Sequence, residues 1–355
     1  MENAEQNMSF FNQDGKVQYF SLNHFLRDIA NGSCCFICGA SPGSKEFNNE
    51  HVIPNWILKR YDLHGQLITL PNGTNFRYGS YKSPCCFDCN KKLGEVFEVP
   101  ISNLLSNSYD DIMEKLAEDN SLVGLLFRWL NLIYLKTHLK DNDIPQSRDH
   151  RNEDGSIGSR HYWEDLHHIH CVARSHYSGA EVKRAAVGTV IVFQVTDPIQ
   201  NFYYYDHSVA KVVLLQLNDF CIVSVLDDGG ACRSILGDSL KKITMPLNIF
   251  QVKEIFSRLV YLNINMAKRP IFQSHITLGG EYEITVKDDG YWELLPEKDR
   301  ILSVGTILKS FVELQTERLS SDPEKIEFFL EQIESEKMGF LFNSNGEFIV
   351  NDQGE

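Results

Sequence analysis

Two pairs of cysteines constrain the fold of this chain more than any other feature of its sequence. The pairs are Cys35 with Cys38 and Cys86 with Cys89, each separated by two residues. That spacing allows a tight turn to direct both sulfurs at one tetrahedral ion, and two such turns complete a four-sulfur zinc site. The sequence therefore predicts a small module that a structural Zn²⁺ holds together.

The neighbouring cysteines leave the register of this site to be settled. Cys34 and Cys85 could replace their neighbours only by stretching the spacing to three residues, so we expect both to lie outside the site.

The chain begins without the basic and apolar segments of an export signal, and its densest apolar run, at 122–135, is broken by Arg128 and Asn131. These features predict a cytoplasmic protein without a membrane partner, in which thiols serve as metal ligands more often than as disulfides.

Charge is distributed unevenly along the chain. The net charge is −14, but residues 1–100 contain nine Lys and Arg against ten Asp and Glu, which leaves −13 for residues 101–355. Because duplex binding depends on cations that neutralise phosphates, we expect nucleic-acid contacts only in the first hundred residues. The basic residues available there include Lys59, Arg60, Arg77, Lys82, Lys91 and Lys92. The acidic residues 101–355 are better suited to docking on a basic protein partner or to restraining the function of residues 1–100.

The length of 355 residues and the local patterns predict an α+β protein with a small zinc-stapled module and a larger C-terminal domain. Within the module, a Pro71-Asn72-Gly73 turn lies between two short extended segments, which predicts a hairpin. Apolar residues at helical spacing between 101 and 139 predict two helices, and β-branched runs between 187 and 225 predict a sheet. A helix at about 248–266, a strand pair around 287–290 and an acidic helix at 323–335 complete the pattern. The expected divisions are 1–32 (a strand and helix extension), 33–100 (the module), 101–150 (a helical connector) and 151–355 (an α+β domain with a regulatory or specificity role).

Further motifs lie between and after the cysteine pairs. Glu50-His51-Val52-Ile53-Pro54 stands inside the insertion, and Asn90 follows the last cysteine directly, before a Leu93-Gly94 pair. With these elements the segment 33–100 resembles the HNH endonucleases of the ββα-metal class, in the branch that reads CxxC, EHxxP and CxxCN. The resemblance covers that segment only.

The resemblance implies a set of roles for a phosphodiester hydrolase. His51 would be the general base that activates water, while Glu50 and Asn90 would bind the catalytic ion. These are oxygen ligands, so the expected ion is Mg²⁺ or Mn²⁺. Glu98 lies where related sequences often carry an acid and is a further candidate ligand, the alternative being a solvated helix face. We expect Asn90 to begin a helix that Pro100 ends.

The leading hypothesis is a metal-dependent HNH endonuclease that hydrolyses DNA, such as the nuclease component of a bacterial anti-phage or restriction-type system. The first alternative is a non-catalytic zinc adaptor for nucleic acid or protein, in which His51 serves the scaffold alone. The second is an RNA-cutting toxin, because the chemistry of the site does not itself distinguish the two sugars. A cluster of histidines at 161–176 could hold a second metal through His167 and His170, but ordinary polar histidines are favoured there.

Overall fold

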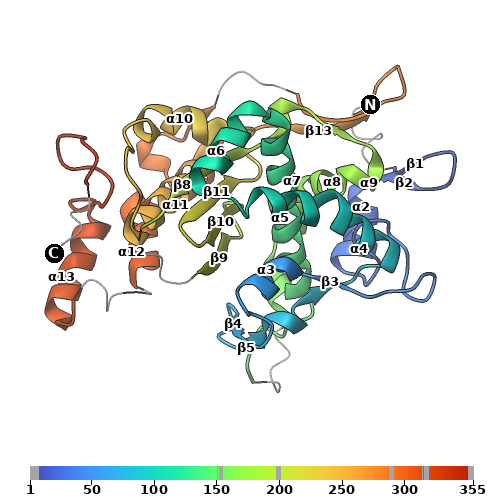
Figure 1. Cartoon of the computed structure of the whole chain (residues 1–355), viewed down its shortest axis with the longest axis horizontal. Coiled ribbons are helices and arrows are strands. Elements are labelled where there is room, and N and C mark those ends of the chain that lie inside the picture. Colours follow the sequence, from blue (N-terminus) through green and yellow to red (C-terminus); the bar gives the residue numbers. More distant parts are fainter. Residues whose placement is uncertain are drawn as a thin grey trace. The chain divides into compact units, whose positions relative to one another are not determined.

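The computed structural model describes residues 8–149, 151, 155–196, 201–287, 292–313, 315 and 320–350 (Figure 1). Helices and strands both contribute, which confirms a mixed α+β protein. The chain divides into two compact units, Met1–Ala186 with Phe272–Thr285, and Val187–Ile271 with Val286–Glu355. Among the residues described, no helix combines the length and the apolar character that crossing a bilayer requires.

The first unit begins with short elements that surround the two cysteine pairs. β3 (Glu50–His51) and β6 (Lys82–Ser83) form an antiparallel pair in which Glu50 lies opposite Ser83 and His51 opposite Lys82. The predicted hairpin is confirmed as β4 (Leu67–Thr69) and β5 (Asn75–Arg77). The other elements are β1 (Phe10–Phe11), β2 (Val17–Tyr19), α2 (Leu22–His24), the π-helical η1 (Phe25–Ala30), α3 (Asn55–Arg60) and the 3₁₀ turn η2 (Tyr78–Ser80).

The helix after the second cysteine pair differs from the predicted one. It begins earlier, as α4 (Phe87–Leu93), and continues through a π-helical turn, η3 (Gly94–Glu98), into α5 (Val99–Leu104). Pro100 therefore does not end it, and the expectation of a helix from Asn90 that stops at Pro100 is wrong. The physical reason is that Pro100 occupies the first turn of α5, directly after the π-helical turn. Proline is tolerated at a helix start, where its missing amide hydrogen costs little.

The centre of the first unit is α7 (Asn120–Asp141), which is buried on most of its surface. It is the strongly buried helix expected between 101 and 139, and α6 (Tyr109–Glu118) precedes it. Around it lie the 3₁₀ turn η4 (Ile157–Arg160), α8 (Trp163–Ala173) and α9 (Ser175–Ser178). A three-stranded sheet of β13 (Phe272–Ile276), β14 (Tyr282–Val286) and β7 (Glu181–Val182), followed by the 3₁₀ turn η5 (Arg184–Ala186), completes the unit.

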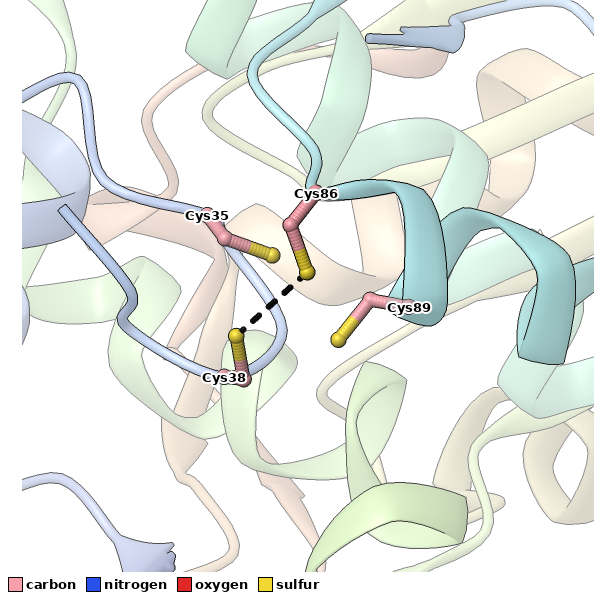
Figure 2. Close-up of side chains that lie close together, drawn as sticks. All are labelled: Cys35, Cys38, Cys86 and Cys89. Carbon is pink, nitrogen blue, oxygen red and sulfur yellow. Dashed lines mark hydrogen bonds between the residues drawn. The ribbon is translucent and has the colours of Figure 1, made fainter. Parts of the chain in front are cut away.

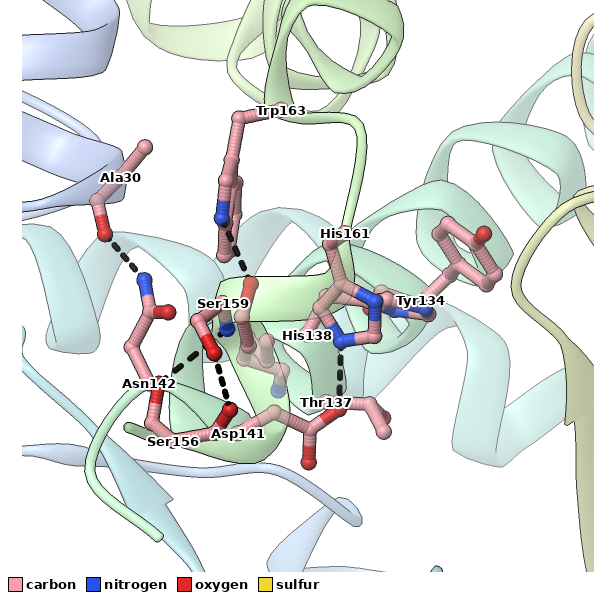
Figure 3. Close-up of polar contacts among 12 residues, drawn as sticks. Ala30, Tyr134, Thr137, His138, Asp141, Asn142, Ser156, Ser159, His161 and Trp163 are labelled. Atoms are coloured by element: carbon pink, nitrogen blue, oxygen red, sulfur yellow. Dashed lines mark hydrogen bonds and ion pairs between the residues drawn. The ribbon is translucent and has the colours of Figure 1, made fainter. Parts of the chain in front are cut away.

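Polar contacts at the end of α7 hold the following loop in place (Figure 3). His161 Nε2 lies 2.9 Å from Asp141 Oδ2, and Trp163 Nε1 donates to the carbonyl oxygen of Gly158 at 3.0 Å. Asn142 Nδ2 donates to the Ala30 carbonyl, which connects the same region to the N-terminal segment. The segment that follows α7 is thus anchored to the central helix.

The second unit contains the predicted sheet, four antiparallel strands in the order β8-β11-β10-β9. The strands are β8 (Thr189–Gln194), β9 (Phe202–His207), β10 (Val212–Leu217) and β11 (Phe220–Val225). α11 (Ile249–Ile264) packs on one face, where Val252, Phe256 and Leu259 share a core with Leu214 and Val223. The remaining elements are α10 (Ala231–Leu240), β12 (Met266–Lys268), β15 (Glu293–Leu294), the 3₁₀ turn η6 (Glu297–Asp299), α12 (Val304–Val312) and α13 (Pro323–Glu334), which is the predicted acidic helix.

The strand pair expected around 287–290 has different partners. β14 pairs with β13 and with β7, while β15 pairs with β12. The turn signal at Asp288-Asp289-Gly290 lies outside the described residues. Local turn chemistry cannot identify the partner of a strand, because pairing depends on packing against distant elements.

Candidate metal centre and adjoining polar site

The four paired cysteines come together as one buried cluster (Figure 2). Their sulfur atoms all lie within 4.8 Å of one another, and those of Cys38 and Cys86 are 3.7 Å apart. A tetrahedral zinc ion with bonds of about 2.3 Å places its sulfur ligands about 3.8 Å apart. The cluster could therefore hold a structural metal such as zinc, as the sequence predicts.

Local backbone geometry accounts for this arrangement. The first pair lies on a turn in which the Cys35 amide donates to the Ala40 carbonyl at 2.9 Å and Gly39 adopts a φ of +74°. Glycine is suited to Gly39 because of this left-handed conformation, and because a β-carbon there would approach the Phe20 ring to 2.7 Å. Cys86 caps α4 and Cys89 lies in its first turn, so both sulfurs project from one helix end.

The two additional cysteines, Cys34 and Cys85, lie outside the group of four sulfurs. Cys85 Sγ is 4.0 Å from Cys35 Sγ but does not belong to the group of four, and neither does Cys34. The Cys85 carbonyl accepts hydrogen bonds from the amides of Asn48 and Asn49, each at 3.2 Å. Cys85 thus fixes the loop that leads into β3.

Two buried basic residues, Arg174 and His170, support the first cysteine turn. Arg174 donates to the carbonyl oxygens of Ile37, Gln18 and Val17, and its guanidinium lies 4.6 Å from the centre of the Phe20 ring. His170 Nε2 contacts the Phe36 carbonyl at 2.8 Å. Burial, followed by the charge of Arg174, holds the pKa of His170 well below its ordinary value, so the ring is neutral.

Two of the histidines at 161–176, His167 and His170, are therefore structural supports. Besides His170, His167 contacts the carbonyl of Phe20 through Nε2 at 2.7 Å. Among the residues described, the four cysteines are the one group of three or more His, Cys, Asp or Glu at metal-binding separation.

Glu50, the expected metal ligand, is buried and ion-paired. Lys136 Nζ, on α7, lies 3.0 Å from Glu50 Oε1 and donates to the His51 carbonyl at 2.7 Å. The Lys136 side chain is 0% exposed and that of Glu50 is 9% exposed. The backbone carbonyl of Lys136 also accepts a hydrogen bond from Ser83 Oγ, at 2.9 Å. One residue of α7 therefore holds β3 and β6 together at the Glu50 and Ser83 pair.

His51 is half-buried beside two other basic side chains. Its ring centre is 5.8 Å from that of His64, which is exposed, and Lys82 lies opposite it on β6. Burial, followed by the charges of Lys82, His64 and Lys136, lowers the pKa of His51 to about 4. The imidazole is accordingly neutral and able to accept a proton near neutral pH.

Asn90 connects the cysteine cluster with the start of β3. Its Nδ2 donates to Asn48 Oδ1 and to the Asn49 carbonyl, both at 3.0 Å. Within the described part of the chain, Asn90 Oδ1 and Glu50 Oε2 have no hydrogen-bond partner. One oxygen of each side chain is thus without a hydrogen bond. The Lys136 ammonium compensates the Glu50 charge, and a cation bound by Glu50 would compete with it.

Glu98 lies inside the unit and not on a solvated helix face. Its Oε1 accepts a hydrogen bond from Trp129 Nε1 at 3.3 Å, and its Oε2 is buried without a partner among the described residues. Burial raises the pKa of Glu98 to about 7, with Lys136 acting against that change and Glu50 adding to it. Its surroundings are apolar and contain two indoles, since Trp56 stacks on Trp129 with ring centres 6.3 Å apart.

Lys136 and His64 are the neighbours that sequence reasoning missed. A lysine in the middle of an otherwise apolar helix was the available signal for Lys136, because such a charge needs a buried partner. No comparable signal singled out His64, which lies in a loop.

No protein-family model, no curated protein and no solved structure matches this chain.

Proposed function

We propose that this protein is a metal-dependent endonuclease of the HNH kind that hydrolyses DNA phosphodiester bonds. The observation that carries the proposal is the combination of a neutral, half-buried His51 with the order β3, β6, α4 beside the cysteine cluster. That order is a strand pair followed by a helix, and Asn90 on the helix contacts the loop that precedes Glu50 and His51.

In the proposed reaction each side chain has a separate task. His51 removes a proton from the attacking water, and the Lys82 ammonium faces the phosphate oxygens. Glu50 and Asn90 would hold a divalent ion, which would offset negative charge on the phosphate. Lys136 fixes Glu50 and the His51 backbone from the buried side, so that the imidazole keeps its position while the proton moves.

The exposed cations Lys59, Lys91 and Lys92, which belong to the module, support DNA as the substrate because they can neutralise phosphates. The acidic region 101–355 supports a role in regulation or in docking a basic protein. We include in the proposal a place as the nuclease component of a bacterial anti-phage or restriction-type system.

One observation favours a second candidate, a non-catalytic zinc adaptor. The charge of Glu50 is already compensated by Lys136, and a purely structural carboxylate would have the same environment. In that case the cysteine cluster would position a binding surface for nucleic acid or protein, and His51 would have no chemical role.

Cutting of supercoiled plasmid with Mg²⁺ or Mn²⁺ decides between the two. We expect the natural protein to relax the plasmid and His51→Ala to do so at least about 100-fold more slowly, because the general base is lost. His275→Ala, which removes a histidine that is 45% exposed on β13, is the matched control and should cut normally. Metal analysis of all three proteins checks that the zinc content is unchanged, and a structured RNA is assayed in parallel.

A natural protein that binds zinc but cuts neither nucleic acid with either ion would establish the adaptor. Equal cutting by His51→Ala and by the natural protein would remove His51 from the mechanism.

A further inference from the structure

An exposed histidine lies beside His51 without any structural task of its own. His64 follows Leu63, which is buried, in the loop between α3 and β4. Its ring meets the His51 ring edge to face, at an interplanar angle of 83° and 5.8 Å between centres. Among the described residues the His64 ring has no hydrogen-bond partner, so it contributes little to the stability of the loop.

The backbone of Tyr78 and Gly79 holds the loop that contains His64 close to His51. The Gly79 amide donates to the His64 carbonyl at 3.2 Å, and the Tyr78 amide donates to the Gln66 carbonyl at 3.1 Å. A β-carbon at Gly79 would lie 2.9 Å from the His64 carbonyl oxygen and 3.0 Å from His64 Nδ1. The close approach of the two segments therefore depends on glycine at this position, and it fixes where His64 lies.

The two imidazoles and one ammonium form a cluster suited to a phosphodiester. Lys82 lies opposite His51 in the β3 and β6 register and is partly exposed. A hydrogen bond from an imidazole spans about 3 Å, so two rings at this separation can each contact a different oxygen of one phosphate group. A base and an acid acting on different oxygens are what hydrolysis of a phosphodiester requires.

We propose that His64 is a second catalytic residue, the general acid that protonates the leaving oxygen. This inference rests on the proposed nuclease function. In the step, the water oxygen forms a bond to phosphorus while His51 takes the water proton, and the bond from phosphorus to the bridging oxygen breaks. Protonated His64 gives its proton to that oxygen, so the products are a phosphate monoester and an alcohol. Exchange of protons with solvent returns both rings to their starting states.

A DNA with sulfur in place of the bridging leaving oxygen tests this role. A thiolate leaves without protonation, because its conjugate acid is much stronger than that of an alkoxide. We expect His64→Ala to cut ordinary DNA at least about 100-fold more slowly than the natural protein, but to cut the sulfur-bridged DNA at close to the natural rate. His51→Ala should be slow on both substrates. Substrates with sulfur at the 3′ and at the 5′ bridging position are assayed separately with the same divalent ion.

Each result has a distinct meaning. Natural-rate cutting of ordinary DNA by His64→Ala overturns the inference while the proposed function stands, and so does an equal loss on ordinary and sulfur-bridged DNA, which indicates a positioning role. Failure of the natural protein to cut any substrate overturns the proposed function and the inference with it. Because His64 is exposed, the variant should keep its zinc content and its thermal midpoint, and these are measured first.

Discussion

Replacing Cys89 with serine is expected to abolish metal binding and to unfold the first unit. The four sulfurs are buried within 4.8 Å of one another, and removing one of them leaves three sulfur ligands for an ion that requires four. A structural zinc ion contributes on the order of 10 kcal/mol of folding free energy in small domains, which exceeds the stability of many proteins. We expect less than one-tenth of the natural metal content by elemental analysis, with loss of the cooperative thermal transition of this unit.

Cys85→Ser is the matched control for this experiment. Cys85 is as buried as Cys89 and its sulfur is 4.0 Å from Cys35 Sγ, but it lies outside the group of four. This variant should therefore keep a full equivalent of metal and lose only about 1–3 kcal/mol, the usual cost of a buried polar replacement. If Cys85→Ser loses the ion and Cys89→Ser retains it, the register of the site is wrong. If the natural protein and Cys89→Ser melt alike, the cluster holds no structural metal.

The sequence predicts the cysteine cluster because its chemistry is local. Two residues between cysteines define a turn, and Cys86 and Cys89 lie within one helical turn, so the only long-range step is the meeting of the two pairs. The Pro71-Asn72-Gly73 hairpin is local in the same way. The Asn72 side chain accepts from the Thr74 amide at 2.9 Å, as an asparagine in a turn commonly does.

The pairing of Glu50 and His51 with Lys136 was missed because its partners come from distant parts of the chain, although a lysine within an apolar helix signals that it needs a buried partner. Lys136 follows Glu50 by 86 positions, and its side chain is directed by the packing of α7 against β6. The prediction that Pro100 ends the helix failed for a related reason, since a rule about single residues does not foresee a π-helical turn. The roles of Glu50, His51 and Asn90 remain predictions, and the structure adds to them the residues with which each one interacts.

Loss of the Lys136 charge is expected to destabilise the first unit strongly. In Lys136→Met the Glu50 carboxylate stays buried without its partner, and the His51 carbonyl loses the hydrogen bond that Lys136 Nζ donates to it. Breaking a buried ion pair by removing one member costs about 3–5 kcal/mol, mainly because the remaining charge is uncompensated. Urea denaturation of the metal-loaded protein, followed by circular dichroism, measures the change in unfolding free energy.

A double variant separates the charge from the packing. Glu50→Gln combined with Lys136→Met removes both charges, so it should be more stable than Lys136→Met alone, by at least about 1 kcal/mol. Lys140→Met is the matched control one turn along α7, where the partner Asp143 is 57% exposed, and it should change stability by no more than about 1 kcal/mol. If Lys136→Met matches the control, or if the double variant is no better than the single one, the buried pair does not brace β3. The carboxylate of Glu50 would then be free to serve an ion alone, and the competition between ammonium and metal would not exist.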